Sequence, residues 1–131
     1  MKNLAIMVFL AGAFSLQSTD QLSVVHLEAP KYPRLAHVAR IQGETSITIE
    51  IDANGEVATA KATTGHPLLR QAAVDNIRNW TFERPAKAPV TQTVVYEYGI
   101  EGKAVDYACP TVTFDLPTRV RIVIQPLIPQ P

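Results

Sequence analysis

The chain has 131 residues, of which 47% are hydrophobic and 18% charged, and this composition is typical of a single globular domain rather than a disordered chain. Twelve basic and twelve acidic side chains give a formal net charge of zero at pH 7. A neutral chain lacks the basic excess with which proteins bind nucleic-acid phosphates, so we expect no nucleic-acid partner.

Residues 1–18 are predicted to be a secretory signal peptide. Lys2 precedes an apolar run from Leu4 to Leu16, and small residues favour cleavage either after Ala13 or near Ser18. The run is shorter than the roughly 20 apolar residues that a membrane-spanning helix needs, which disfavours the alternative of an uncleaved anchor. We therefore expect a periplasmic or secreted protein with no stable membrane span after signal cleavage.

A short helix is expected after Pro33, because proline suits the first position of a helix and Gly43 ends the segment. Its apolar face is expected to consist of Leu35, Ala36, Val38 and Ala39.

The next segment alternates strictly between apolar or β-branched and polar residues, which predicts a half-buried strand over residues 44–52. One face of this strand should carry Thr45, Ile47, Ile49 and Ile51. Residues 52–55 end in Asn-Gly, which favours a tight turn, and residues 56–64 read as the returning strand. The sequence therefore predicts a β-hairpin.

A second helix is predicted to begin at Pro67, behind Gly65 and His66. Its apolar positions recur at helical spacing and share one face, which we expect to cover the isoleucine face of the hairpin. These positions are Leu69, Ala73, Ile77 and Trp80.

Three further strands are predicted toward the C-terminus. Residues 91–100 alternate through Val94, Tyr96, Tyr98 and Ile100, and residues 111–116 and 119–125 read as two more strands around Pro117. Arg119 and Arg121 should lie on the solvated face of the last strand. The order of elements predicts the α+β class, in which helices cover one face of an antiparallel sheet.

The sequence carries no motif for catalysis or metal binding. His26, His37 and His66 lack the spacing of metal ligands. His66 precedes Pro67 and is expected to cap the second helix, with an anion contact at the helix start as the alternative. We therefore expect no metal, no cofactor and no enzymatic activity.

The turn around Asp52 has a spacing that resembles a calcium loop. Asp52, Asn54 and Glu56 alternate as calcium ligands do, but the twelfth position holds Thr63 instead of an acidic residue. An enzyme built on this scaffold remains the alternative, and a polar cleft that gathers His66, Asp52 and Glu56 would favour it.

Cys109 is the only cysteine, so the chain cannot form an internal disulfide. No cationic residue stands beside it in the sequence, and we expect a buried thiol that acts as a small hydrophobe. A reactive thiol is the alternative.

Residues 30–100 resemble the C-terminal domain of the TonB family. The resemblance consists of an ordered set of short matches: Tyr32-Pro33 with Ala36, Gly43, Asp52 with Asn54-Gly55, Gly65-His66-Pro67, Leu69, Ala72-Ala73, Trp80 with Phe82, and Pro85.

The resemblance implies two helices packed on a three-stranded antiparallel sheet, followed in this chain by a β extension with a proline-rich tail over residues 101–131. It also implies a non-catalytic periplasmic domain that engages outer-membrane receptors in TonB-dependent transport. In such domains a receptor segment adds as a strand to the sheet edge. The corresponding edge here consists of Thr93, Val94, Val95, Tyr96, Glu97 and Tyr98.

Two features depart from the family pattern. Energy transducers of the family have an inner-membrane anchor and a long proline-rich spacer, whereas residues 19–30 here would reach at most about 40 Å, so we expect no transfer of force across the envelope. The second departure is the pair of extension strands at residues 112–116 and 119–125. They could pair with the third predicted strand, residues 91–100, and either block its edge or move partner binding to a new edge.

An exported interaction or inhibitor protein without a role in transport is the alternative function, and a strand-exchanged homodimer is an alternative state.

Overall fold

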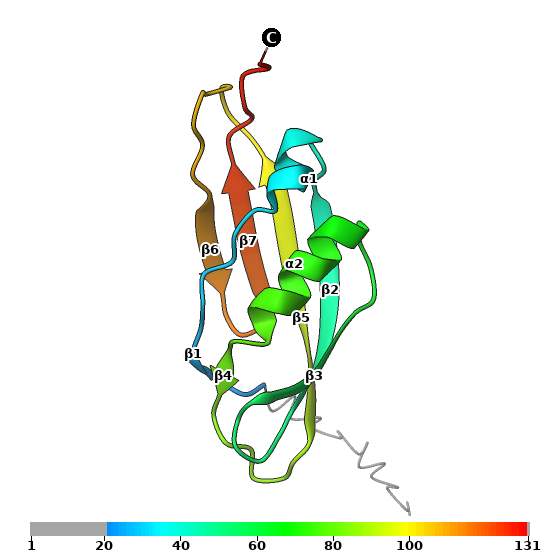
Figure 1. The fold of residues 1–131 in the computed structure, drawn as a ribbon. Helices are drawn as coiled ribbons and strands as arrows, with labels where there is room; N and C mark the ends of the chain where they lie inside the picture. Colours follow the sequence, from blue (N-terminus) through cyan, green and yellow to red (C-terminus); the bar gives the residue numbers. More distant parts are fainter. Residues whose placement is uncertain (1–20, 131) are drawn as a thin grey trace, which may run out of the picture.

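The computed structural model describes residues 21–130, so the predicted signal peptide lies outside the described residues. The fold is α+β, with two helices on one face of a five-stranded sheet and a small two-stranded sheet at one end (Figure 1). The elements in chain order are β1 (Val24–His26), α1 (Arg34–Val38), β2 (Gly43–Ile51), β3 (Val57–Ala62), α2 (Pro67–Ile77), β4 (Thr81–Phe82), β5 (Val90–Ile100), β6 (Thr111–Asp115) and β7 (Arg119–Ile124).

The main sheet differs from the expected three-stranded antiparallel layout. Its strand order is β3-β2-β5-β7-β6, so both strands of the C-terminal extension belong to the same sheet as the core hairpin. Neighbouring strands are antiparallel except β5 and β7, which are parallel. The α+β class is confirmed, whereas the prediction of three strands and a purely antiparallel sheet is wrong.

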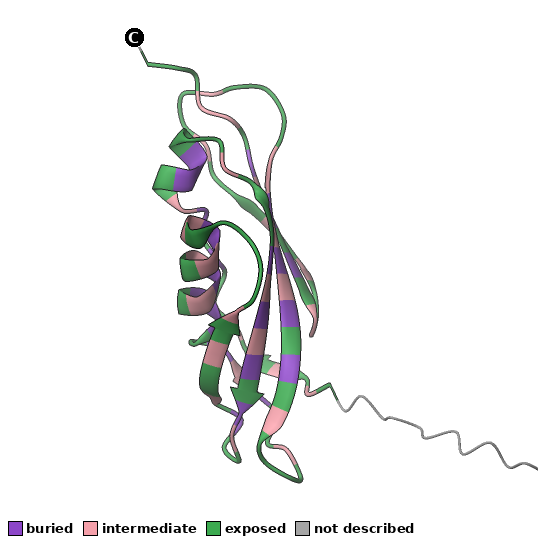
Figure 2. Ribbon diagram, turned by 90° about the vertical axis from the view of Figure 1, so that its right-hand side faces the viewer, coloured by how far each residue is buried: buried purple, intermediate pink, exposed green. Residues whose placement is uncertain are grey.

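The hairpin of β2 and β3 confirms the alternation in the sequence. Thr45, Ile47, Ile49 and Ile51 are fully buried on the face that the helices cover, and Figure 2 shows both helices on that one side. The turn requires Gly55, whose φ of +81° is rarely adopted by other residues. A Cβ at this position would also lie 2.1 Å from the carbonyl oxygen of Phe82.

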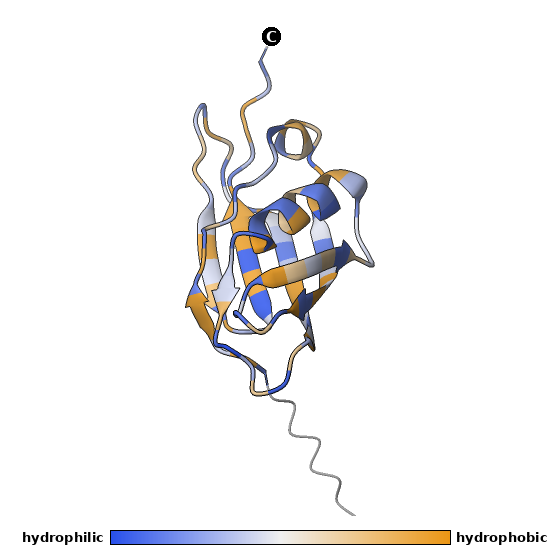
Figure 3. Ribbon diagram, turned by 60° about the horizontal axis from the view of Figure 1, so that its bottom comes forward, coloured by the Kyte–Doolittle hydropathy of each residue, from blue (hydrophilic) through white to orange (hydrophobic). Residues whose placement is uncertain are grey.

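Helix α2 begins as predicted, and His66 caps it. The Nδ1 atom of His66 accepts a hydrogen bond of 3.1 Å from the Leu68 amide, and Pro67 occupies the first turn. Leu69, Ala73 and Ile77 are fully buried, and Trp80, just beyond the helix, is 1% exposed. Figure 3 shows apolar and polar residues alternating along the strands beneath this helix.

Helix α1 forms at the predicted place, but only part of its expected apolar face is packed. Ala36 is fully buried, whereas Leu35 is 70% and Val38 62% exposed, and Ala39 is also exposed. His37, next to Ala36 in the helix, is also buried, and its Nε2 atom lies 2.7 Å from the carbonyl oxygen of Gln125. The helix therefore contacts the sheet and the C-terminal tail through Ala36 and His37 and leaves its longest aliphatic side chains in solvent.

A buried polar residue, Asn76, connects α2 to three other parts of the core. Its Oδ1 atom accepts hydrogen bonds from the Tyr96 hydroxyl (2.7 Å) and the Trp80 indole (3.1 Å), and its Nδ2 donates to the Glu28 carbonyl (2.9 Å). Burial raises the pKa of Tyr96 and Tyr98 well above the ordinary tyrosine value, so both hydroxyls stay protonated. The Tyr98 hydroxyl is buried and has no hydrogen-bond partner among the described residues.

Trp80→Ala should lower the free energy of unfolding by about 3–5 kcal/mol, because it leaves a large cavity between α2, Phe82 and Tyr96. Thermal and urea unfolding of the purified chain measure this loss. Leu35→Ala is the matched control, since that side chain is mostly exposed and its removal should change stability little. An unchanged melting midpoint for Trp80→Ala would contradict the placement of Trp80 in the core.

The two stacked tyrosines of β5 should respond differently to removal of their hydroxyls. Tyr96→Phe deletes a buried hydrogen bond to Asn76 and should cost about 0.5–1.5 kcal/mol. Tyr98→Phe removes an unpaired buried hydroxyl and should leave stability unchanged or raise it. Urea unfolding of the two variants makes the comparison, and a larger loss for Tyr98→Phe would show that its hydroxyl is paired.

Candidate partner-binding edge

Strand β5 contains the predicted partner-binding residues, but it is an inner strand over most of their length. From Val90 to Tyr98 it pairs with β2, with Gly43 opposite Tyr98 and Ile51 opposite Val90. On the other side, Val95 to Ile100 pair with Arg119 to Ile124 of β7. The structure therefore has the alternative arrangement, in which the extension pairs with this strand: Val95, Tyr96, Glu97 and Tyr98 are paired on both sides, whereas Thr93 and Val94 precede the β7 pairing.

Apolar burial holds β7 in this place. Val120 and Ile122 are fully buried and Ile124 is 5% exposed, so every second side chain of β7 enters the core under the helices. Backbone hydrogen bonds also join the two strands at both ends of the β5–β7 pairing. The Val95 amide donates to the Thr118 carbonyl (2.8 Å), and the Glu101 amide donates to the Ile124 carbonyl (2.9 Å). β7 is thus an integral core strand, and its removal would expose the centre of the sheet.

Ion pairs on the opposite, solvated face link β7 to β2, to β5 and to the residue that follows β5. Arg119 Nη1 lies 3.1 Å from Glu44 Oε1 of β2 and 3.2 Å from Glu97 Oε2 of β5. Arg121 Nη2 lies 2.9 Å from Glu101 Oε1. The hydrogen bond and charge of Glu44 raise the pKa of Arg119. Both arginines are on the solvated face, as predicted, and exposed ion pairs of this kind contribute little to stability.

Strand β6 becomes the outer edge on this side of the sheet. Within the described residues it pairs only with β7, from Thr111 opposite Val123 to Asp115 opposite Arg119. Val112 and Phe114 point toward the helix-covered face and are only partly buried, and Phe114 packs on Trp80 with ring centroids 6.2 Å apart. This edge therefore combines a backbone that is paired on one side with apolar side chains that are half covered.

Strand β3 forms the opposite edge of the sheet, where it pairs only with β2 within residues 21–130. Its side chains are small apart from Lys61, which is exposed. A lysine on an edge strand is a common device against unwanted strand pairing.

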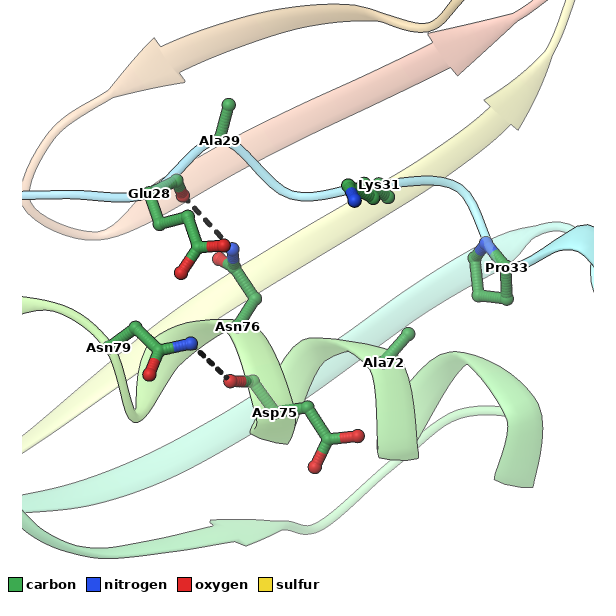
Figure 4. A pocket seen from close by; sticks show the side chains of 8 residues that line it. All are labelled: Glu28, Ala29, Lys31, Pro33, Ala72, Asp75, Asn76 and Asn79. Carbon is green, nitrogen blue, oxygen red and sulfur yellow. Dashed lines mark hydrogen bonds between the residues drawn. The ribbon is translucent and has the colours of Figure 1, made fainter.

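A groove of about 270 Å³ lies between residues 28–33 and α2 (Figure 4). Three of its polar side chains are engaged within the protein: Asn76 donates across it to the Glu28 carbonyl, Asn79 Nδ2 donates to the Asp75 carbonyl (3.2 Å), and the Asp75 carboxylate accepts from Gln71 (2.8 Å). Among residues 21–130 there is no group of three or more His, Cys, Asp or Glu side chains placed to hold a metal ion. The hydrogen bond from Asn76 to the Glu28 carbonyl holds the N-terminal segment against α2.

The residues considered for an enzymatic cleft lie apart. Asp52 and Glu56 flank the β2–β3 turn, whereas His66 precedes α2 at the far end of β3, about 20 Å away for a strand of this length. Asp52 Oδ1 accepts hydrogen bonds from the amides of Asn54 (2.9 Å) and Glu56 (3.0 Å), so this carboxylate stabilises the turn. The structure does not bring the three side chains into one site.

Cys109 is exposed, in the segment between β5 and β6, so the prediction of a buried thiol is wrong. The segment leaves the sheet at the end of β5 and returns to it as β6.

Comparison with known proteins identifies the family. A model of the family described as "Gram-negative bacterial TonB protein C-terminal" matches residues 28–100. Two proteins named TonB, from Xanthomonas campestris pv. campestris strains B100 and ATCC 33913, are each 35% identical to this chain over 63 residues, which cover 47% of this chain. The matched part spans 28% of each relative's length.

No helix within residues 21–130 has the length and apolar character needed to cross a membrane. The family match starts before α1 and ends with β5, so it covers both helices and the four strands β2 to β5, whereas β6 and β7 lie beyond it. By this match, the chain belongs to the TonB C-terminal domain family.

Proposed function

We propose that the chain is a non-catalytic protein-binding domain of the bacterial cell envelope, which binds an extended segment of its partner by strand addition. Membership of the TonB C-terminal family supports a binding domain. The observation that carries the proposal is the position of β7, which fills the side of β5 where the family resemblance implies partner binding and leaves β6 outermost. In this chain the binding edge is therefore β6, Thr111–Asp115.

The side chains of β6 suit an added strand better than those of β3. Alternate side chains of an added strand would lie beside Val112 and Phe114 on the helix-covered face and complete their burial. Thr111 and Thr113 face solvent and offer β-branched neighbours on the other side. β3 offers small side chains and the edge-protecting Lys61 instead.

The proposed partner is a segment of an outer-membrane receptor or of another envelope protein, and the proposed compartment is the periplasm. The signal-like pattern of residues 1–18 and the TonB family match support this location. Partner affinity would come from backbone hydrogen bonds, and selectivity from the side chains that meet Val112 and Phe114.

The occupied edge of β5 favours a second candidate function, that of an envelope interaction or inhibitor protein with no role in transport. A domain whose β5 edge is filled by its own β7 cannot bind a receptor segment there as the family resemblance implies. Deleting the protein separates the two functions: impaired receptor-mediated uptake supports the transport role, and unchanged uptake supports the alternative.

Amide hydrogen exchange should show that β5 is an inner strand. Amides of Val95 to Tyr98 lie between β2 and β7 and should exchange as slowly as those of β2. Amides of the edge strands β3 and β6 should exchange faster on average, because one side of each strand is open. Fast exchange across Val95 to Tyr98 would show that β7 detaches readily and that β5 itself is the accessible edge.

Site-directed photo-cross-linking should locate the partner on β6. In a Cys109→Ser background, Thr113→Cys and Thr59→Cys place a benzophenone label on the solvated face of β6 and β3 respectively, both at exposed positions. After incubation with envelope extract and identification by mass spectrometry, the Thr113 label should capture a specific protein and the Thr59 label should not.

The identity of the captured protein distinguishes the two functions. An outer-membrane receptor supports the transport role, whereas another envelope protein supports the interaction or inhibitor role. Capture of the same protein through Thr59 alone would move the binding edge to β3, and capture of none through either label would contradict strand addition.

A further inference from the structure

Most of the strongly exposed large hydrophobic side chains gather at one end of the molecule. Leu35 (70% exposed) and Val38 (62%) lie on α1, Tyr107 (83%) in the β5–β6 loop and Ile128 (41%) in the C-terminal tail. Figures 1 and 2 both show α1, this loop and the tail at the end where the C-terminus emerges. We call these four residues the apolar tip.

The parts of the apolar tip are joined to one another. Val38 and Arg40 line a hollow of about 340 Å³ together with Leu127 and Ile128, which connects α1 to the tail. The Val105 amide donates to the Pro126 carbonyl (2.9 Å) and the Ile128 amide to the Val105 carbonyl (3.0 Å), which connects the tail to the loop. The tip is therefore one surface made of three segments.

Cations accompany the apolar tip. Arg34, Arg40 and Lys103 are exposed in the same segments, and none of them forms an ion pair with a residue between 21 and 130. Two acidic residues lie in the loop, and one of them, Glu101, is already paired with Arg121 at 2.9 Å. The other is the exposed Asp106, so three cations against this one carboxylate give the surface around the apolar side chains a net positive charge.

We propose that the apolar tip docks on the surface of an anionic phospholipid membrane. Protruding aliphatic side chains, an exposed tyrosine and surrounding cations are the combination that binds the interface of a bilayer, with the apolar groups among the acyl chains and the cations at the headgroups. The proposal concerns a different surface from the β6 edge and does not depend on strand addition.

An acidic protein segment is a less suitable occupant. The backbone groups of Val105, Pro126 and Ile128 at the tip are hydrogen-bonded to one another, so this pairing leaves them unavailable to an extended peptide. Leu35 protrudes from a five-residue helix, and the hollow beside Val38 is bordered by the tail residues Leu127 and Ile128 instead of forming an extended groove for a peptide. A lipid surface needs neither open backbone groups nor a groove.

The native Cys109 provides a probe beside Tyr107, since it is exposed and is the only thiol of the chain. An environment-sensitive nitrobenzoxadiazole label on Cys109 of the full chain should shift to the blue with vesicles of equal parts phosphatidylglycerol and phosphatidylcholine. It should not shift with phosphatidylcholine alone, and high salt should reverse the shift.

A label at the other end of the molecule is the control. In the Cys109→Ser background, Val25→Cys places the same dye on β1, where Val25 is 68% exposed; Figure 1 shows β1 far from the end that carries α1 and the C-terminus. This label should not respond. The comparison also excludes attachment through the apolar run at residues 4–16, which would retain the protein on vesicles without bringing the tip to the membrane.

Variants of the tip test which side chains bind the membrane. Arg34→Ala and Arg40→Ala should each weaken binding to the anionic vesicles about fivefold, and Leu35→Asp with Val38→Asp should abolish it. Lys61→Ala, an exposed lysine on β3, is the matched control and should leave binding unchanged. Unchanged melting midpoints would show that the variants are folded.

Three results would overturn the proposal. They are a silent Cys109 label with anionic vesicles, an equal response of the Val25 and Cys109 labels, and tip variants that retain vesicle binding. If the same tip variants instead lose the protein captured by cross-linking, the tip is a protein-docking surface.

Discussion

The parallel pairing of β7 with β5 determines the architecture of this chain beyond its family core. Two parallel strands cannot be joined by a tight hairpin, so the chain must return along the sheet before it pairs with β5. β6 makes this return antiparallel to β7 and is left outermost. The same pairing decides which backbone is open to a partner, because it converts the predicted edge of β5 into the middle of the sheet.

The added strands also explain the position of the N-terminal segment. A five-stranded sheet presents a wider apolar face than the single long helix α2 covers. Residues 22–33 lie over the additional part, held by hydrogen bonds from Asn76 and Trp80 to the Glu28 carbonyl. Asn76 therefore does more than satisfy the Tyr96 hydroxyl, since it fixes the position of a loop that completes the layer above β6 and β7.

The elements with strong periodicity were predictable, because side-chain alternation records which face is buried. Ile47, Ile49 and Ile51 in β2 and the apolar face of α2 follow directly from this rule. The position of the last hairpin does not, since both of its strands alternate and either could pair with β5. A signal lies in the composition: β7 buries Val120, Ile122 and Ile124 as an inner strand does, whereas β6 is rich in threonine and ends in Asp115.

The predictions that failed concern which other segments pack over a residue, not which face of its own element the residue lies on. Leu35 and Val38 share a helix face as the sequence indicates, but no element of the described chain packs over them. Cys109 is exposed in the loop between β5 and β6, and its apolar character alone indicated burial. Local sequence specifies an element's own faces, whereas burial depends on distant segments, and the exceptions here gather at the surface proposed to bind a membrane.

The two proposed surfaces are arranged so that they can act together. β6 begins at Thr111, a few residues after Tyr107 of the apolar tip, and runs away from that end of the molecule (Figure 1). With the tip on a membrane, the near end of the β6 edge would lie close to the lipid surface, and its five residues would extend about 17 Å from that end. A partner segment emerging from the same membrane would meet this edge at a high effective concentration, so weak strand addition over a short edge would suffice for binding. The short length of β6 is therefore compatible with partner binding when membrane docking restricts where the domain and its partner meet.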